Sequence, residues 1–270
     1  MIWIKNTGFV QVERRDKLFT GSDGCRHEPA RGKGGSGDSC FTCQMRPASE
    51  WGVLQEDEVS SLNDSKICNT YRPGQIIFYQ GNPCLGVYCI ESGTVAIRKT
   101  DAAGNSVLVR LAHEGQTLGY RTYFSGGGYT ASAEALTEAR ICFVDRAAVR
   151  RLLDLNPALG MRFLKRISDD LRDSEDQRLA AASLPVRARV AHLLLVLKDR
   201  CATVDEDGTL VIELPLARQD IAAMLGTRPE TIARTTKALE EDGVAEFRGR
   251  HVLVQDLDML LDEVEQVSAR

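Results

Sequence analysis

Long apolar runs are missing from this sequence of 270 residues. The longest, residues 190–197, is far shorter than the roughly 20 apolar residues that cross a bilayer, so we expect no membrane partner. The N-terminal residues lack the apolar region and cleavage site of a secretory signal, which predicts a cytoplasmic protein. In that reducing compartment, the eight cysteines are expected to bind metal, take part in redox chemistry or lie in the core, rather than form structural disulfides.

An excess of positive charge is missing as well. The chain has 34 Lys and Arg against 38 Asp and Glu, and its net charge is −4. Since the global charge repels nucleic acid, a nucleic-acid partner requires a local basic surface.

The pattern along the chain changes three times. Residues 1–47 have no clear periodicity and contain cysteines and a Gly-rich, linker-like stretch at 31–37. Residues 48–155 contain short β-rich runs separated by regularly placed glycines, which predicts a small antiparallel β-barrel. The remaining residues indicate a long helix over 156–183 and a further domain over 184–270, so the fold class is α+β.

Apolar residues recur every four positions in the long helix: Leu159, Phe163, Ile167 and Leu171. This stripe either packs on the barrel of its own chain or forms a seam between two identical chains. We favour the seam, because the helix is long and ends before the next domain begins, and we assign these four residues to dimerisation. The later half of the helix is acidic, and near a symmetry mate its carboxylates would oppose association: Asp169, Asp170, Asp173, Glu175 and Asp176.

The C-terminal region has the spacing of a helix-turn-helix. Ala222 lets two helices approach closely, Gly226 supplies the turn, and Ile232 anchors the second helix in the core. Pro229 suits the first turn of that second helix. A helix of this kind predicts binding in the major groove of DNA.

One face of the second helix carries Glu230, Ala233, Arg234 and Lys237. Arg234 can bind guanine and Glu230 can accept from cytosine. Alternatively, Glu230 forms a capping box with Thr227 or an ion pair with Arg234.

Other residues are expected to contact the DNA backbone. Arg228 and Lys237 suit phosphate contacts, and Thr227 lies beside them at the turn. Residues 244–254 predict a hairpin, or wing, with Arg248 and Arg250 at its tip. Residues 183–270 hold 11 Lys and Arg against 16 Asp and Glu, so non-specific affinity should be modest and salt dependent.

This order of barrel, long helix and winged helix-turn-helix resembles the CRP/FNR family of bacterial transcription regulators. The resemblance covers roughly residues 45–265, and its most specific motifs lie at 71–75, 80–82, 91–93, 133–136 and 216–234. It implies a cyclic-nucleotide-binding-like barrel (a double-stranded β-helix), a homodimer on palindromic DNA, and contact with RNA polymerase. Glu230 and Arg234 match the family's recognition positions, whereas Ala233 stands where many members have Ser.

The family resemblance also bears on the signal. Members that bind cyclic nucleotides hold the ribose with a Gly-Glu pair and the phosphate with an Arg-Ser/Thr pair. The matching positions here are Gly119-Tyr120 and Tyr129-Thr130, so the acid and the arginine are both missing. Loss of the charged phosphate partner removes strong hydrogen bonds, and we expect no cyclic AMP.

Oxygen-sensing members hold a [4Fe-4S] cluster with N-terminal cysteines and one cysteine on a barrel strand. By this resemblance, the predicted ligands are Cys25, Cys40, Cys43 and Cys142, with Cys68 as a substitute. No third cysteine follows closely after Cys43, which departs from the family pattern. Cys84, Cys89 and Cys201 are interpreted as structural or incidental.

Other interpretations remain open. The cysteines can form a zinc site or a disulfide switch, His113 can ligate haem, and the regulator can lack an effector altogether. A cupin-type enzyme needs several His and Glu ligands in its barrel. That stretch has only His113 and no His-x-His, so we expect no enzyme.

Overall fold

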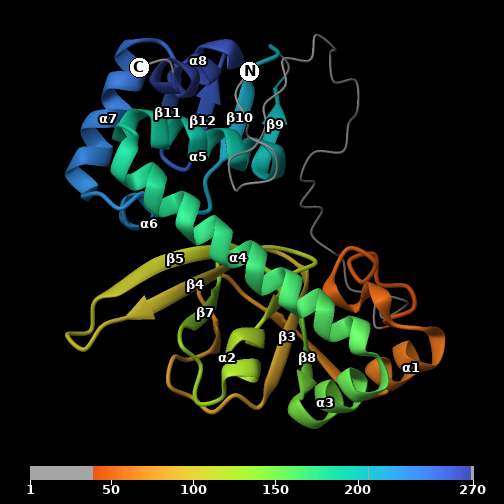
Figure 1. The fold of residues 1–270 in the computed structure, drawn as a ribbon. Coiled ribbons are helices and arrows are strands. Elements are labelled where there is room, and N and C mark those ends of the chain that lie inside the picture. The colour runs from red at the N-terminus through yellow and green to blue at the C-terminus, as the bar shows by residue number, and fades with distance from the viewer. Residues whose placement is uncertain (1–38, 206, 269–270) are drawn as a thin grey trace. The chain divides into compact units, whose positions relative to one another are not determined.

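The computed structural model describes residues 39–205 and 207–268. Within these residues, the chain divides into two compact units between Asp170 and Leu171 (Figure 1). The first unit contains a β-barrel and the second contains a winged helix-turn-helix, joined by the helix α4 (Pro157–Ser183). This order confirms the predicted α+β fold class.

Two antiparallel sheets form the barrel. One has the order β1-β8-β3-β6 and the other has the order β2-β7-β4-β5. The strands are β1 (Lys66–Tyr71), β2 (Ile76–Phe78), β3 (Gly86–Ser92), β4 (Val95–Thr100), β5 (Ser106–Ala112), β6 (Thr117–Leu118), β7 (Ser132–Ala135) and β8 (Ala139–Asp145). Their β-branched and aromatic residues suit a pleated, half-buried surface, and glycines with positive φ such as Gly93 allow the tight turns between them.

Short helices cover the barrel. They are η1 (Glu50–Val53), α1 (Glu56–Ser65), α2 (Tyr120–Ser125) and α3 (Arg146–Leu155). Residues 40–62 pack on the barrel, because Cys40, Trp51, Leu54 and Leu62 are buried in its core. Cys40 is thus the part of the predicted cysteine segment that the structure places against the barrel.

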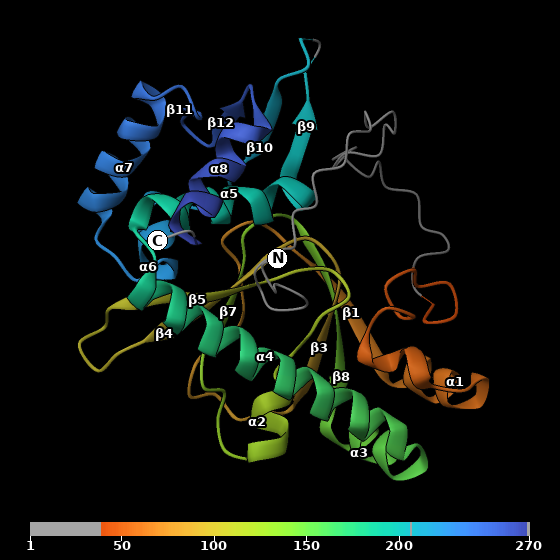
Figure 2. The ribbon, with the colours of Figure 1, turned by 45° about the horizontal axis from the view of Figure 1, so that its top comes forward.

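The first half of α4 lies on the barrel beside α2 and α3 (Figures 1 and 2). Leu159 and Phe163 are fully buried in the barrel core, and Ile167 packs against it. This burial corrects the prediction that all four residues of the stripe form a seam between chains, because three of them are used within their own chain. Only Leu171 among them is exposed, with Met161, Leu164 and Leu179.

The acidic run on α4 is also corrected in part. Asp170 is buried and is paired with arginines of its own barrel unit, while Asp169 pairs with Lys165. These two carboxylates are therefore engaged within the chain, and they do not add repulsion to a dimer seam.

The second unit contains helices and a small sheet of order β11-β12-β10-β9. Its elements are α5 (Val186–Cys201), β9 (Ala202–Val204), β10 (Leu210–Glu213), α6 (Arg218–Met224), α7 (Pro229–Glu241), β11 (Glu246–Arg248), β12 (His251–Val254) and α8 (Leu257–Ser268). Within this unit, α7 lies at the edge opposite β9 in both ribbon views (Figures 1 and 2). None of the helices in the described parts of the chain has both the length and the apolar character needed to span a bilayer.

Candidate functional sites

Helices α6 and α7 form the predicted helix-turn-helix. The inner face of α7 is buried through Ile232, Thr236 and Leu239, and Ala222 of α6 is buried opposite it. Small Ala222 permits the close approach of the two helices, as the spacing predicts. The inner face therefore fixes α7 and leaves its other face free of the core.

The turn between the helices depends on Gly226. Its φ is +60°, a conformation that side chains with a Cβ rarely adopt. The Thr227 amide donates to the carbonyl of Ala222 at 2.9 Å, and Arg189 of α5 donates to the carbonyl of Leu225. These bonds satisfy the carbonyls at the end of α6 and set the angle at which α7 begins.

The outer face of α7 carries the predicted recognition residues. Glu230, Arg234 and Lys237 are exposed, and Ala233 is half-buried between them. The helix begins with Arg228 as N-cap, so Thr227 does not form the capping box that the sequence allowed. Among the described contacts, Glu230 and Arg234 form no ion pair with each other, whereas Lys237 lies 3.4 Å from Glu241. The recognition side chains are therefore available to base edges.

Arg187 of α5 fixes α7 from behind. Its guanidinium pairs with Asp242, just after α7, at 2.5 Å and with Glu263 of α8 at 2.6 Å. Hydrogen bonds to Glu263 and Asp242 raise the pKa of Arg187 above its usual range. The clamp joins three helices and holds the C-terminal end of α7 in place.

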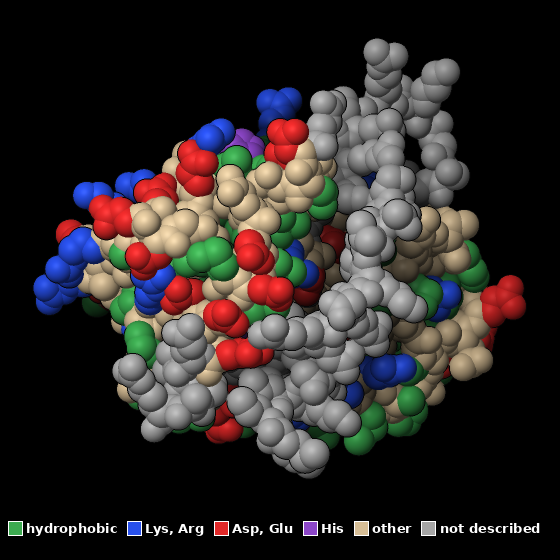
Figure 3. Space-filling view, turned by 90° about the horizontal axis from the view of Figure 1, so that it is seen from above, with side chains coloured by type: hydrophobic (Ala, Val, Ile, Leu, Met, Phe, Trp, Pro, Cys, Tyr) green, Lys and Arg blue, Asp and Glu red, His purple; other side chains and the backbone are tan. Residues whose placement is uncertain are grey.

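The wing forms as predicted, with β11 and β12 joined by a two-residue turn at Gly249 and Arg250. Gly249 has a φ of +65°, and Arg250 is exposed at the tip. Arg248 is paired with Glu246 at 2.7 Å, so its contact with a phosphate requires that it share its guanidinium. Figure 3 shows acidic side chains interspersed among Lys and Arg rather than one uniform basic surface.

A second candidate site is a pocket between the N-terminal segment and the sheet of β1, β8 and β3. We call it the thiol pocket, and the residues that define it are Cys40, Cys43, Arg46, Trp51, Lys66, Cys89, Glu91, Thr117 and Cys142. The structure thus brings three predicted ligands together: Cys40, Cys43 and Cys142. The fourth, Cys25, lies outside the described residues.

Three cysteines form a row across adjacent strands, and two of them, Cys89 and Cys142, line the thiol pocket. Cys68 of β1 and Cys89 of β3 are both direct partners of Cys142 of β8 in the strand register. Directly opposed residues on antiparallel strands lie on one face of the sheet. Sequence analysis missed Cys89, because its place beside Cys142 depends on strand pairing. The only sequence signal was that Cys89 is two residues from both Val87 and Glu91, which puts the three side chains on one face of β3.

Cys68 and Cys142 are joined by a disulfide, which differs from the expectation that the cysteines stay reduced. Cys68 and Cys142 are direct cross-strand partners in the register of β1 and β8, which brings the two sulfurs together. The Glu91 carboxylate lies 3.7 Å from Cys142 Sγ, and these three residues place their donor atoms within 4.8 Å of one another. Such a group of two sulfurs and a carboxylate can hold a metal ion once the disulfide is reduced.

The Cys-x-x-Cys loop is held against this sheet by its backbone. The Cys40 amide donates to Asn63 Oδ1 of α1 at 2.9 Å, and Arg46 Nε donates to the Cys40 carbonyl at 2.9 Å. These contacts fix the loop so that Cys40 is buried and Cys43 is half-buried. The loop therefore presents both sulfurs toward the barrel strands.

The electrostatics of the thiol pocket balance burial against cations. Burial raises the pKa of Cys40, and the neighbouring Lys66 opposes this rise. Burial raises the pKa of Cys89 far above its usual range, so Cys89 remains a thiol unless a metal displaces its proton. Lys66 and Arg46 supply positive charge that would offset thiolates, or an anionic cluster bound by them.

The positions that match the cyclic-nucleotide ligands are occupied by buried aromatic residues. Tyr120 is buried and donates to Asp170, while Tyr129 stacks on Phe78 with ring centroids 4.2 Å apart. The Tyr129 hydroxyl donates to the carbonyl of Gly86 at 2.9 Å. These contacts tie both residues into the core, and the absence of cyclic AMP binding stays a prediction that they favour.

His113, the candidate haem ligand, is buried. Its Nδ1 lies 3.4 Å from the Thr94 hydroxyl, and its amide faces Gln116 Oε1. These contacts give the histidine a structural role in its turn.

Two family models match this chain. One is described as a cyclic nucleotide-binding domain and matches residues 68–156, and the other is described as a Crp-like helix-turn-helix domain and matches residues 188–263. They match in the order that the structure shows, one in each compact unit. Together with a curated relative described as a transcriptional activator, these matches indicate a transcription regulator, which contradicts the cupin-type enzyme.

Curated relatives agree with this assignment. The transcriptional activator protein FnrL of Cereibacter sphaeroides is 26% identical over 83% of this chain and 91% of its own length. A CRP-like cAMP-activated global transcriptional regulator of Mycobacterium tuberculosis is 28% identical over 69% of this chain and 83% of its own length. The chain is thus similar over most of its length to transcriptional regulators, one of which is described as cAMP-activated.

Solved structures show the same fold. FixK2 from Bradyrhizobium japonicum superimposes with a TM-score of 0.63 at 24% identity, covering 73% of this chain and 96% of its own. A CRP/FNR family regulator from Thermus thermophilus superimposes with a TM-score of 0.62 at 24% identity, covering 74% and 98%.

Proposed function

Because this chain belongs to the CRP/FNR family of DNA-binding transcription regulators, we propose that it binds palindromic DNA as a homodimer and senses a signal at the thiol pocket. The observation that supports the DNA interface is the exposed recognition face of α7, supported from below by Ile232 and Leu239. Arg234 reads a guanine, Glu230 accepts from a cytosine, and Lys237, Arg228 and Arg250 contact phosphates. RNA polymerase is the second macromolecular partner that the family implies.

The exposed apolar side chains of α4 support the dimer. Met161, Leu164 and Leu171 are separated by three and seven residues, intervals that occur between a and d positions of a coiled-coil seam, and each is more than half exposed. This stripe shares Leu171 with the predicted one, whose Leu159 and Phe163 are buried in the barrel core. Two copies of α4 that pair along it remove these side chains from water, a gain that the single chain lacks.

The sulfur-rich wall supports a signal at the thiol pocket. Cys40, Cys43 and Cys142 line it, and Cys68 or Cys89 can act as fourth donor in place of Cys25. These donors suit soft metals, and the apolar lining with Lys66 and Arg46 suits the negative charge of a [4Fe-4S] cluster. When bound, such a cluster supplies reactivity toward oxygen or nitric oxide. The residues of the chain hold it, restrict water, and tie the Cys-x-x-Cys loop to the barrel strands.

A thiol-disulfide switch is the second candidate, and the Cys68–Cys142 bond favours it. Iron and sulfide analysis of anaerobically purified protein separates the two. A cluster predicts both elements, visible absorbance that bleaches in air, and loss of both in Cys43→Ser but not in Cys84→Ser, since Cys84 does not line the thiol pocket. Iron-free protein under strict anaerobiosis refutes the cluster, and peptide mapping of the disulfide then tests the switch.

Binding selection with random duplexes tests the DNA interface. We expect enrichment of a palindrome by the native protein and loss of preference at one symmetric position in Arg234→Ala. A protein that enriches no palindrome in reduced, oxidised or reconstituted form refutes the proposal.

A further inference from the structure

Two sulfurs and a carboxylate meet on the sheet wall formed by β1, β8 and β3. Cys68, Glu91 and Cys142 place one donor atom each within 4.8 Å of the others, and Glu91 Oε2 lies 3.7 Å from Cys142 Sγ. The three residues come from three adjacent strands, so strand pairing rather than a loop holds them together. Donors on paired strands keep their positions more closely than donors on a loop, and the group is therefore in place before any ion arrives.

Arg140 of β8 orients the carboxylate of this group. Its Nε donates to Glu91 Oε2 at 2.8 Å, and the same oxygen faces Cys142 Sγ. After reduction, two thiolates and one carboxylate carry three negative charges at a half-buried position. A divalent cation and the Arg140 guanidinium together balance these charges, which suits a place where unpaired charge is costly.

The donor types select the ion. Ca²⁺ and Mg²⁺ take oxygen ligands, whereas thiolates together with a carboxylate suit Zn²⁺. Among the described residues, no fourth Cys, His, Asp or Glu donor shares the 4.8 Å group, and Cys89 on the far side of Cys142 is not part of it. A [4Fe-4S] cluster usually needs four thiolates, but three protein donors and a water complete a tetrahedral zinc site.

The disulfide and a bound ion exclude each other. Zinc binds thiolates, and the sulfurs of the Cys68–Cys142 disulfide carry no charge for it. In the oxidised form, the covalent bond joins β1 to β8. In the reduced form, an ion held by the same two sulfurs and by Glu91 joins β1, β8 and β3.

We propose that Cys68, Glu91 and Cys142 form a Zn²⁺ site whose occupancy is set by the redox state of the two cysteines. The site goes beyond the proposed [4Fe-4S] cluster, because it uses neither Cys40 nor Cys43. On oxidation, the two thiolates give two electrons to a two-electron oxidant, the S–S bond forms, and Zn²⁺ leaves as the hydrated ion. With diamide as the oxidant, its N=N bond takes up the two electrons and two protons and becomes a hydrazine.

Zinc titration of the full chain tests the donor set. The protein is reduced with a phosphine under anaerobic conditions, stripped of metal, and titrated with Zn²⁺ alone against a chromophoric chelator. Arg140→Gln removes only the residue that holds Glu91, so zinc affinity should fall by about 10- to 100-fold. Cys68→Ser and Glu91→Gln each remove a donor and should lower zinc affinity further.

Matched variants show whether the zinc is on the strands. Glu138→Gln removes an exposed carboxylate just before β8, and Cys84→Ser removes a buried thiol that does not line the thiol pocket. Both should bind zinc as the native protein does. Cys43→Ser should also keep the zinc, although it is expected to lose the iron of the cluster. Zinc that is lost in Cys43→Ser and kept in Glu91→Gln overturns the inference.

Oxidation of the native protein gives a second measurement, which needs no variant. Diamide is added to the zinc-loaded chain, free Zn²⁺ is followed with the chelator, and the Cys68–Cys142 linkage is followed by peptide mapping. Release of zinc should keep pace with formation of this disulfide. Zinc that stays bound after the disulfide is complete, or reduced protein that binds no zinc, overturns the inference. Iron and sulfide content reports on the cluster separately, so either proposal can fail without the other.

Discussion

The recognition face of α7 and the thiol pocket are built in opposite ways. The α7 face comes from one short helix whose outer side chains are exposed and whose inner side chains are buried. The thiol pocket is assembled from residues of the N-terminal segment and of β1, β3 and β8, with a buried floor. The α7 face is local and exposed to solvent, whereas the thiol pocket is composed of distant segments and is mostly buried.

This difference indicates how each site responds to change. Exposed side chains on α7 contribute little to folding, so they can be altered with loss of binding alone. Groups buried at the thiol pocket affect both folding stability and the response to a signal, because buried charges have little water to compensate them. The buried carboxylate of Asp170 affects folding stability for the same reason. The exposed face of α7 suits recognition of a DNA sequence, and the buried thiol pocket suits a change of state in response to a signal.

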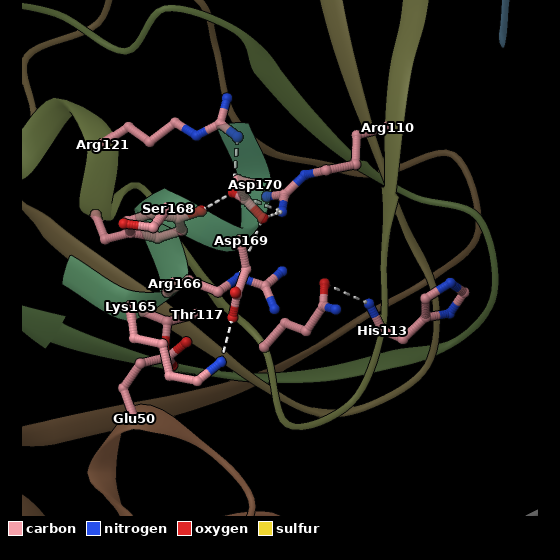
Figure 4. A network of polar contacts seen from close by, with 12 residues as sticks. Glu50, Arg110, His113, Thr117, Arg121, Lys165, Arg166, Ser168, Asp169 and Asp170 are labelled. Atoms are coloured by element: carbon pink, nitrogen blue, oxygen red, sulfur yellow. Dashed lines mark hydrogen bonds and ion pairs between the residues drawn. The ribbon is translucent and has the colours of Figure 1, made fainter. Parts of the chain in front are cut away.

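The largest expected effect lies in the buried contacts. Asp170→Asn should lower the free energy of unfolding by about 3–5 kcal/mol at neutral pH, since it removes the buried carboxylate that pairs with Arg110, Arg121 and Arg166 (Figure 4). The pKa of Asp170 is depressed in the folded protein, so its contribution is present above its unfolded pKa and is lost as the pH falls through the folded value.

Urea denaturation at several pH values measures this contribution. The difference between native protein and Asp170→Asn should shrink below about pH 4, the unperturbed range of an Asp carboxyl. Asp169→Asn, at the more exposed neighbour, should change stability by less than about 0.5 kcal/mol. A large loss in Asp169→Asn would erase the contrast between buried and exposed carboxylates.

The next effect concerns DNA binding without loss of stability. Arg234→Ala should weaken binding to the selected palindrome by about 10- to 100-fold and relax preference at the base that it reads. Lys237→Ala should instead weaken binding to all sequences and lower the salt slope by about 1. Titrations by fluorescence anisotropy at several salt concentrations distinguish these outcomes, and unchanged affinity in Arg234→Ala would reject α7 as the reading helix.

The turn of the helix-turn-helix lies between the two extremes. Gly226→Ala should cost about 1–2 kcal/mol of unfolding free energy, because φ is +60° and a Cβ is disfavoured there. The loss reflects backbone conformation rather than collision, since a Cβ would meet no atom closer than 3.9 Å. Gly226→Asn should recover part of the loss in thermal melts, and an equal loss for Ala and Asn would contradict this reason.

The smallest effect is expected at the wing. Arg250→Ala removes one exposed cation from a hairpin tip, so affinity should fall only a few-fold and equally for all sequences. Stability should not change. Anisotropy titrations against selected and scrambled duplexes measure the ratio, and a loss confined to the selected duplex would indicate that the wing reads bases.

Local signals made most of the fold predictable. The small residue at Ala222, the turn at Gly226 and the anchor at Ile232 are close in sequence, so the helix-turn-helix could be placed from these residues alone. The apolar stripe of α4 was also visible, but its partner was not. The spacing of the apolar residues does not tell whether they pack on the barrel or on a second copy of the chain. In the structure, Leu159 and Phe163 are buried in the barrel core.

The thiol pocket was predictable only in part. Resemblance to oxygen sensors indicated Cys40, Cys43 and Cys142, and the structure places all three on one pocket. Cys89 was missed because cross-strand neighbours are fixed by sheet register, which a single sequence does not reveal. The contacts of Thr117 with Glu50 and of Arg110 and Arg121 with Asp170 were hidden for a similar reason, since they join distant parts of the chain.

The central position of Cys142 in its row gives the sheet an exclusive choice. A strand on each side offers it a sulfur, and the loop above offers two more, yet its single sulfur atom commits to one covalent or metal partner at a time. Whichever partner holds Cys142 denies it to the others while the strands stay still. When that partner is Cys68, release of Cys142 requires a reductant rather than a refolding event.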